Sequence, residues 1–158
     1  TFNTSMQPTI TAGYSYFSGQ DATATDLEAW MPVFPANIAS RVGKIAYPLL
    51  FPAGEGIVNP LCGTGSGLQV INVGLGLKPT EKITIGLDLF NLTADESGAA
   101  SDDYGNEIDL SLTYAYTEDV SFGIDLGMLL TGDNIEDTLA GVDVEDPWQA
   151  IVSMKVVF

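Results

Sequence analysis

The sequence predicts an all-β fold built from antiparallel strands. Three observations predict it: six segments in which apolar and polar residues alternate with a period of two, tight turns that alternate with long loops, and acidic residues gathered in those loops. The 158 residues carry 5 Lys and Arg against 21 Asp and Glu, a net charge of −16, yet the mean hydropathy is +0.20. Charged and apolar residues must therefore occupy different parts of the chain.

The first three expected strands are residues 9–16, 71–78 and 82–89. In the first, alternate positions hold Ile, Ala, Tyr and Tyr, with Thr, Gly and Ser between them. The second sets Ile, Val, Leu and Leu against Asn, Gly, Gly and Lys, and the third sets Ile, Ile, Leu and Leu against Lys, Thr, Gly and Asp. Such alternation is typical of strands with one apolar face.

The last three expected strands are residues 107–117, 120–131 and 148–158. Their apolar positions hold Ile, Leu, Leu, Tyr, Tyr, then Val, Phe, Ile, Leu, Met, Leu, then Trp, Ala, Val, Met, Val, Phe. The positions between them are mostly small or polar. One face of each strand is therefore wholly apolar and the other mixed.

Tight turns and long loops alternate between these strands. Residues 78–81 and 117–119 are short enough for hairpins. The long connections, residues 18–67, 93–105 and 132–147, hold 14 of the 21 acidic residues. Because antiparallel strands alternate in direction, the three long loops fall on one rim of the sheet and both turns on the other.

The mixed face favours a transmembrane β-barrel over a soluble sandwich or a lipocalin-like barrel. A sandwich would carry many Lys, Glu, Arg and Gln outside, whereas this face is mostly Gly, Ser, Thr and Asn with isolated charges, as in a barrel lumen. Strands of about ten residues tilted by about 45° match a bilayer core. Aromatic residues near the strand ends suit an interfacial girdle: Tyr14, Tyr16, Tyr114, Tyr116, Trp148 and Phe158.

Six strands are too few for a closed membrane barrel, which needs about eight or more. An open sheet edge in lipid would leave backbone groups unpaired. We therefore expect residues 1–158 to be the C-terminal segment of one barrel domain, completed by the same precursor or by another chain. The alternative is a barrel closed by several copies. With the last strand ending in the periplasm, the long loops face outward.

Several motifs resemble the C-terminal region of the alginate-export family of outer-membrane channels. They are, in order, Tyr14-Ser15-Tyr16-Phe17-Ser18-Gly19-Gln20-Asp21, Phe51-Pro52-Ala53-Gly54, Leu75-Gly76-Leu77-Lys78-Pro79-Thr80-Glu81-Lys82, Gly105-Asn106-Glu107-Ile108-Asp109-Leu110 and Leu130-Thr131-Gly132-Asp133. The resemblance implies six strands of a barrel of about eighteen, in the outer membrane of a Gram-negative bacterium. The terminal Phe158 looks like the signal read by the barrel-assembly machinery.

The expected lumen departs from what a channel for a polyanion requires, because such a channel should concentrate positive potential. Four acidic residues fall on inward positions, which we interpret as a cation-favouring wall; the alternative is ordinary lumen charge paired with lysines. The expected pore-lining residues are Asp88, Glu107, Asp109, Asp125, Lys78, Lys82, Lys155, Asn72 and Gln149.

The longest loop, residues 18–67, exceeds ordinary loop lengths and is rich in apolar residues. Folding into the pore as a constriction, packing on a partner protein or packing on itself as a cap would each bury them. The apolar residues concerned include Trp30, Phe34, Ile38, Val42, Ile45 and Phe51.

Two further features leave alternatives open. The oxygen-rich last loop could bind Ca²⁺ through Asp133, Glu136, Asp137 and Asp143, or could be a solvated acidic rim. The single cysteine, Cys62, could bond to a segment outside this sequence or to a second chain, or could remain a free thiol.

The composition also excludes several functions. Five scattered cations cannot neutralise a row of phosphates, which excludes nucleic-acid binding. Without histidine there is no Ser-His or Cys-His pair and no zinc ligand set, so we expect no enzyme and, Ca²⁺ apart, no cofactor. We expect a porin-like channel for passive diffusion of small hydrophilic or cationic solutes, with membrane lipid, the rest of the barrel and the assembly machinery as partners. The alternative is a structural sleeve that houses a partner such as an electron-transfer subunit.

Overall fold

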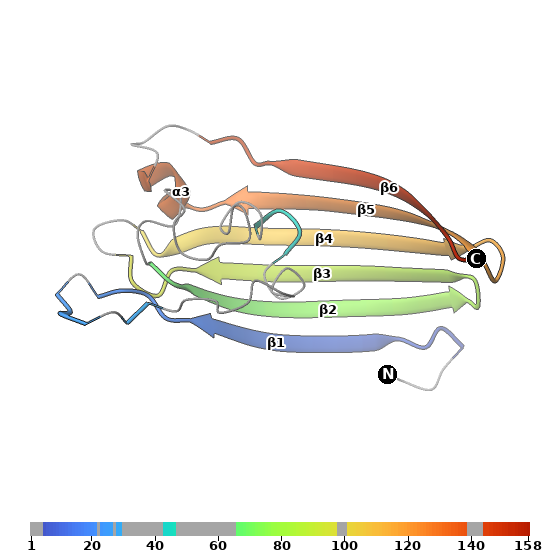
Figure 1. Ribbon diagram of the computed structural model, residues 1–158, viewed down its shortest axis with the longest axis horizontal. Coiled ribbons are helices and arrows are strands. Elements are labelled where there is room, and N and C mark those ends of the chain that lie inside the picture. The colour runs from blue at the N-terminus through green and yellow to red at the C-terminus, as the bar shows by residue number, and fades with distance from the viewer. Residues whose placement is uncertain are drawn as a thin grey trace.

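The structure, a computed structural model, describes residues 5–21, 23–26, 28–29, 43–46, 66–97, 101–138 and 144–158. Six strands form one antiparallel sheet in which each strand pairs with its neighbours in the chain (Figure 1). The strands are β1 (Thr9–Phe17), β2 (Leu68–Thr80), β3 (Ile83–Thr93), β4 (Asp103–Ala115), β5 (Val120–Thr131) and β6 (Trp148–Val156). The predicted all-β fold, its six strands and their antiparallel order are confirmed.

The turns and the long connections occupy opposite ends of the sheet, as predicted (Figure 1). The turns after β2 and β4 lie at one end, here named the turn end. The connections after β1, β3 and β5 lie at the other, the loop end, where the short helix α3 (Asp133–Thr138) follows β5. No helix in the described ranges has the length and apolar character needed to cross a membrane.

The strand register gives the sheet two chemically different faces. One row of paired positions crosses all six strands with apolar side chains only: Ile10, Leu75, Leu87, Leu110, Leu126 and Ala150. The adjacent row holds small or polar residues: Thr11, Gly74, Asp88, Asp109, Gly127 and Gln149. Because successive side chains point to opposite faces, these rows define an apolar face and a polar face.

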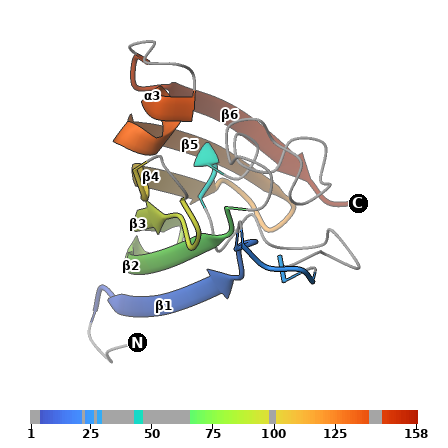
Figure 2. The ribbon, with the colours of Figure 1, turned by 90° about the vertical axis from the view of Figure 1, so that its left-hand side faces the viewer.

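The sheet is curved, and residues 43–46 lie on its concave side (Figure 2). These four residues belong to the long connection between β1 and β2, and we call them the covering segment. Their contacts with β4 and β5 place them on the polar face. The polar face is therefore the concave face.

Three strands reach further toward the loop end than the sequence predicts. β2 begins at Leu68 rather than at residue 71, β3 runs to Thr93 rather than to 89, and β4 begins at Asp103 rather than at 107. The expected loop 93–105 is correspondingly shorter. In these extensions the polar-face positions hold apolar residues such as Val70 and Phe90, and the opposite face holds Gln69, Asn91 and Asn106, so the alternation is inverted.

The buried core lies at the loop end, where the sheet packs against the covering segment and the loops. By the register, Val70, Phe90, Leu92 and Leu129 all point to the polar face there. The core comprises Ile45, Ala46, Leu68, Val70, Phe90, Leu92, Ala94, Tyr104, Leu129 and Ile135. At the loop end the concave face is therefore an apolar packing surface.

Candidate functional site

The apolar face is exposed along its whole length. Its side chains are solvent-accessible on all six strands, with Trp148 75% and Val152 79% exposed. Among the exposed residues are Ile10, Ile71, Val73, Leu75, Leu89, Ile108, Leu110, Leu112, Ile124, Leu126, Met128, Met154 and Val156. A contiguous apolar surface of this extent is far larger than a soluble monomer exposes to water.

Aromatic residues border the apolar face at both ends. At the loop end, the Tyr14 hydroxyl donates to Gln69 Oε1 at 3.0 Å and the Tyr16 hydroxyl donates to Asp95 Oδ2 at 2.9 Å. Trp148 begins β6 at this end. Rings with one apolar side and one hydrogen-bonded tip suit the boundary between an apolar and an aqueous phase.

At the turn end, the border is made by rings in contact with one another. The Tyr116 ring centroid lies 6.4 Å from that of Tyr114 and 6.3 Å from that of Phe122. Phe158 is fully exposed at the same end. The predicted girdle residues therefore form two borders, one at each end of the apolar face.

The distance between these borders follows from one strand. Trp148 and Phe158 are ten residues apart on β6 and its short continuation. At about 3.3 Å per residue this is about 33 Å, and a strand tilted by about 40° would project it onto about 25 Å, the height of the apolar band of outer-membrane barrels.

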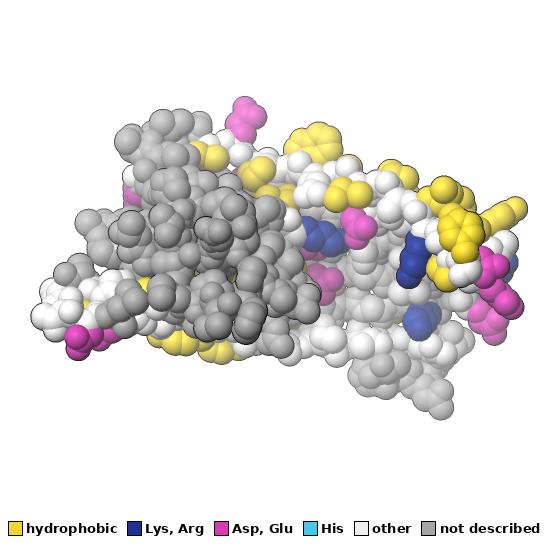
Figure 3. Space-filling model, in the orientation of Figure 1, with side chains coloured by type: hydrophobic (Ala, Val, Ile, Leu, Met, Phe, Trp, Pro, Cys, Tyr) yellow, Lys and Arg dark blue, Asp and Glu magenta, His cyan; other side chains and the backbone are white. Residues whose placement is uncertain are grey.

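The polar face toward the turn end is lined by small side chains. Gly74, Gly86, Gly123 and Gly127 lie here, each beside a polar side chain that occupies the space a β-carbon would need. Figure 3 shows this face. Between the loop end and the turn end it carries small uncharged side chains and a few Lys, Asp and Glu side chains. The glycines let neighbouring side chains lie flat and leave the concave side open.

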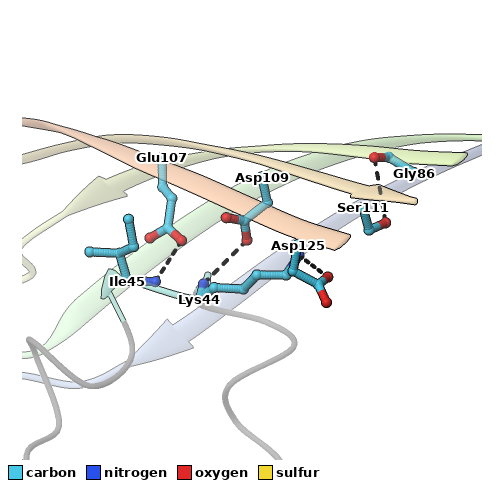
Figure 4. Close-up of polar contacts among 7 residues, drawn as sticks. All are labelled: Lys44, Ile45, Gly86, Glu107, Asp109, Ser111 and Asp125. Carbon is cyan, nitrogen blue, oxygen red and sulfur yellow. Dashed lines mark hydrogen bonds and ion pairs between the residues drawn. The ribbon is translucent and has the colours of Figure 1, made fainter. Parts of the chain in front are cut away.

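The covering segment is held on this face by two carboxylates of β4. The N–H groups of Ile45 and Ala46 donate to Glu107 Oε1 and Oε2 at 2.7 and 2.6 Å, and the N–H of Lys44 donates to Asp109 Oδ2 at 3.2 Å (Figure 4). Ile45 and Ala46 are buried against the sheet. The segment therefore presents three consecutive N–H groups to two adjacent inward carboxylates.

Glycines on both sides make this close approach feasible. Gly43 has φ +109°, a conformation that other residues rarely adopt, and a β-carbon there would lie 2.5 Å from Glu107 Oε2. Behind Asp109, a β-carbon on Gly127 would lie 2.8 Å from its Oδ1. A larger residue at either position would displace the segment or its carboxylate.

The side chain of Lys44 reaches across to the next strand. Its Nζ forms an ion pair with Asp125 Oδ1 at 2.7 Å, and about a third of each side chain is exposed (35% and 37%). Ion pairs this exposed contribute about 0–1 kcal/mol to stability, whereas hydrogen bonds to a charged group contribute about 1.5–3 kcal/mol. The backbone hydrogen bonds to Glu107 therefore contribute most to holding the segment in place. The ion pair mainly brings the positive charge of Lys44 next to Asp125.

The covering segment buries some of the four acidic residues predicted to line the pore, so fewer of them face the concave side. Glu107 is 0% exposed and Asp109 3% exposed, and within the described part of the chain Asp109 Oδ1 has no hydrogen-bond partner. Asp88 and Asp125 remain half-buried. Of the four predicted wall residues, two lie beneath the covering segment and a third is paired with Lys44.

The other predicted pore-lining residues take several positions. Asn72 and Gln149 lie on the polar face, opposite Gly13 and Gly127. Lys155 pairs in register with Ser121 on the same face, and Lys82 Nζ donates to the Tyr116 carbonyl at 3.3 Å. Lys78 is exposed and lies where the β2–β3 register shifts. The alternation of side chains therefore does not assign it to either face.

Three of the predicted Ca²⁺ residues, Asp133, Glu136 and Asp137, lie in α3. Asp137 accepts a hydrogen bond from the Ser101 N–H at 3.0 Å, and the Asn134 side chain donates to the Ser101 carbonyl. In the described ranges no group of three or more His, Cys, Asp or Glu side chains is placed to hold a metal ion. Asp133 and Glu136 are described, Asp143 is not, and calcium binding stays a prediction.

Other predictions for the long loop fall outside the described residues: Trp30, Phe34, Ile38, Val42, Phe51 and Cys62. Ile45, from the same apolar set, is buried on the concave face of the sheet. Near the start of this loop, Asp21 Oδ1 accepts hydrogen bonds from the N–H and the hydroxyl of Thr23, both at 2.7 Å. These bonds hold the pKa of Asp21 below its ordinary value.

Sequence reasoning missed the role of Gly43 and Lys44, although one signal pointed to it. Glu107 lies between Phe90 and Leu129 on neighbouring strands, so an inward carboxylate sits among apolar side chains. A carboxylate there needs hydrogen-bond donors. Loop 18–67 holds the only lysine and arginine residues outside the predicted strands. It is therefore the loop that would be expected to pack against this carboxylate.

No family model matches the chain, and no curated protein or solved structure matches it either. The resemblance to alginate-export channels therefore stays a prediction.

Proposed function

We propose that this chain forms part of the wall of a transmembrane β-barrel in the outer membrane of a Gram-negative bacterium, and that the barrel is a pore for passive diffusion of small hydrophilic solutes. The observation that carries the proposal is the pairing of a continuous exposed apolar face with a small-residue polar face on the same strands. Lipid would cover the first and water would fill the space beside the second.

Burial of the apolar face supports lipid as its environment. Fully burying one Val, Leu or Ile side chain contributes about 1.5–3 kcal/mol, and exposed side chains of this kind occur on every strand. A soluble fold would cover them with a second layer, whereas the described loop segments pack on the opposite, polar face. The aromatic borders lie about 33 Å apart along the strand, and a tilt of about 40° would bring this to the height of a bilayer's apolar band.

The sheet edges indicate how the wall would be completed. Among the described strands, β1 and β6 each have one hydrogen-bonded neighbour. In lipid, each unpaired backbone group costs several kcal/mol. We therefore propose that further strands pair with both edges, supplied by the same precursor, by another chain or by further copies. The alginate-export resemblance favours a single barrel of about eighteen strands.

The concave face supports a narrowed rather than a wide pore. The covering segment occupies the polar face near the loop end, while the face beyond it is open and lined by small residues. Small hydrophilic solutes fit such a passage better than a bulky polymer. A barrel with this lining needs no bound cofactor to conduct.

The test is conductance of the purified protein in a planar lipid bilayer. The protein is extracted from the outer membrane with mild detergent, in the form in which it occurs there, and added to a bilayer in KCl. We expect discrete conductance steps of uniform size that a heat-denatured portion of the same preparation does not give.

Two results would contradict the pore. Recovery of the protein with the water-soluble fraction, without detergent, would exclude the membrane wall itself. Absence of steps, together with a second protein that co-purifies and fills the barrel, would support the structural sleeve instead.

A further inference from the structure

We propose that Lys44 controls the ion selectivity of this pore: the covering segment buries Glu107 and Asp109, two of the four wall carboxylates, and places one cation beside a third, Asp125. The inference rests on the proposed pore function. It assigns specificity to a loop residue rather than to the acidic wall that the sequence predicts.

The first step is the loss of accessible negative charge. Glu107 and Asp109 are nearly inaccessible to solvent beneath the covering segment, and their oxygens accept its N–H groups. An ion passing along the polar face cannot contact either carboxylate. Their charge reaches it only through the segment that neutralises them in part.

The second step is the position of Lys44. Its backbone is fixed by Asp109 and its ammonium group by Asp125, while about a third of its side chain stays exposed. Lys44 is therefore held by two contacts, which Figure 4 shows, and its side chain stays partly exposed. Asp125 alone would attract cations at this depth, and the ion pair cancels that attraction.

The third step is isolation from other charges. Lys155 lies on the same face, in register with Ser121, four residues along β5 from Asp125. Four residues correspond to about 13 Å, beyond the Debye length of about 8 Å at physiological ionic strength. The field at Asp125 is therefore governed by Lys44 and hardly by Lys155, although both carry one positive charge.

These steps predict a pore with a weaker preference for cations than four accessible carboxylates would give, because Glu107 and Asp109 are buried and Asp125 is paired with Lys44, which leaves Asp88. Without Lys44 the preference for cations would be stronger. Without Asp125 it would shift toward anions.

The experiment is a reversal-potential measurement in a planar bilayer under a KCl gradient. Lys44→Met should raise the cation-to-anion permeability ratio by about 25-fold, because one unit charge at about 4 Å in water changes the partitioning of a cation about fivefold and that of an anion about fivefold in the opposite direction. Lys44→Arg should behave like the wild type. The matched control is Lys155→Met, which changes the net charge equally and should shift the ratio much less.

A reciprocal variant separates selectivity from folding. Asp125→Asn should shift the ratio in the opposite direction, toward anions, which loss of structure alone would not do. Equal shifts for Lys44→Met and Lys155→Met, or shifts of the same sign for Lys44→Met and Asp125→Asn, would overturn the inference while the pore stands. A wild-type protein that gives no conductance contradicts the pore itself.

Discussion

The Glu107 carboxylate accepts the N–H of Ile45 at 2.7 Å, although the two residues are 62 positions apart in the chain. A second N–H, that of Ala46, occupies the other oxygen of the same carboxylate at 2.6 Å. Each oxygen of this buried carboxyl group thus accepts a hydrogen bond from one of two adjacent backbone N–H groups. The first predictions concern this contact.

Replacing Glu107 with Gln should release the covering segment. The amide keeps one acceptor oxygen but turns an N–H₂ donor toward the second backbone N–H, so one hydrogen bond is lost and two donors face each other. Loss of a hydrogen bond to a charged group costs about 1.5–3 kcal/mol, about tenfold or more in the population of the released form. Trypsin cleavage after Lys44 in the folded protein should accelerate accordingly.

The matched control for this variant is Glu118→Gln in the exposed turn after β4. It removes the same charge and leaves the covering segment in place. Cleavage after Lys44 that is equally fast in both variants, or unchanged in Glu107→Gln, would show that the carboxylate does not hold the segment.

Gly43→Ala should also displace the covering segment. The added β-carbon would lie 2.5–2.8 Å from the Glu107 carboxylate, and alanine disfavours the φ of +109°. We expect a loss of about 1–3 kcal/mol, the cost of a strained backbone conformation. Gly76→Ala is the control, because its β-carbon would meet nothing nearer than 3.6 Å. Thermal unfolding in detergent should show a lower midpoint for the first variant only.

An arginine on the apolar face should impair membrane insertion. Leu110 lies in the central row of that face, where an arginine at the bilayer midplane costs about 2–4 kcal/mol. Thr113→Arg, three residues along the same strand on the polar face, should be tolerated. The fraction of protein folded into lipid vesicles should fall for Leu110→Arg alone. Equal insertion of both variants would contradict lipid contact at the apolar face.

The pKa of Asp21 should reflect the hydrogen bonds of the turn at the start of the long loop. Its hydrogen bonds from Thr23 lower its pKa in the folded state, so the ionised carboxylate stabilises the turn at pH values above its unfolded pKa. That contribution is lost as the pH falls through the folded pKa. Thr23→Val removes the hydroxyl donor and keeps the N–H, so NMR titration should find a pKa nearer the ordinary value. An unchanged pKa would show that the hydroxyl plays no part.

The sheet could be predicted from the sequence because its signal is local. In each strand, residues two positions apart lie on the same face, so the alternation predicts which side chains share a face. Leu87 and Leu110, which pair in register, were both assigned to the apolar face in this way. The strand extensions could not be predicted, because what determines them is not local in the sequence. At Phe90 and Leu92 the polar face is apolar because loops cover it, and no period within the strand reports a distant loop.

The covering segment was predicted only in outline. An apolar loop of that length had to bury its side chains somewhere, which left a constriction, a partner contact and a self-packed cap as alternatives. That Gly43 and Lys44 would meet Glu107 and Asp125 depends on the three-dimensional register of the sheet with a segment 64 to 81 residues away. Burial of Glu107 and Asp109 could not be predicted from the strands, because the donors that cover them lie more than 60 residues away in the sequence.

The chain-order pairing of the strands has a consequence for the sequence of folding events. β2 to β6 form with partners that are adjacent in the chain, whereas the Glu107–Ile45 and Lys44–Asp125 contacts close loops of 62 and 81 residues. Loop closure costs more entropy as the loop lengthens, and non-local contacts form later than local ones. We therefore expect the strands of the sheet to pair first and the covering segment to dock afterwards, so that the concave face is covered only in the finished protein.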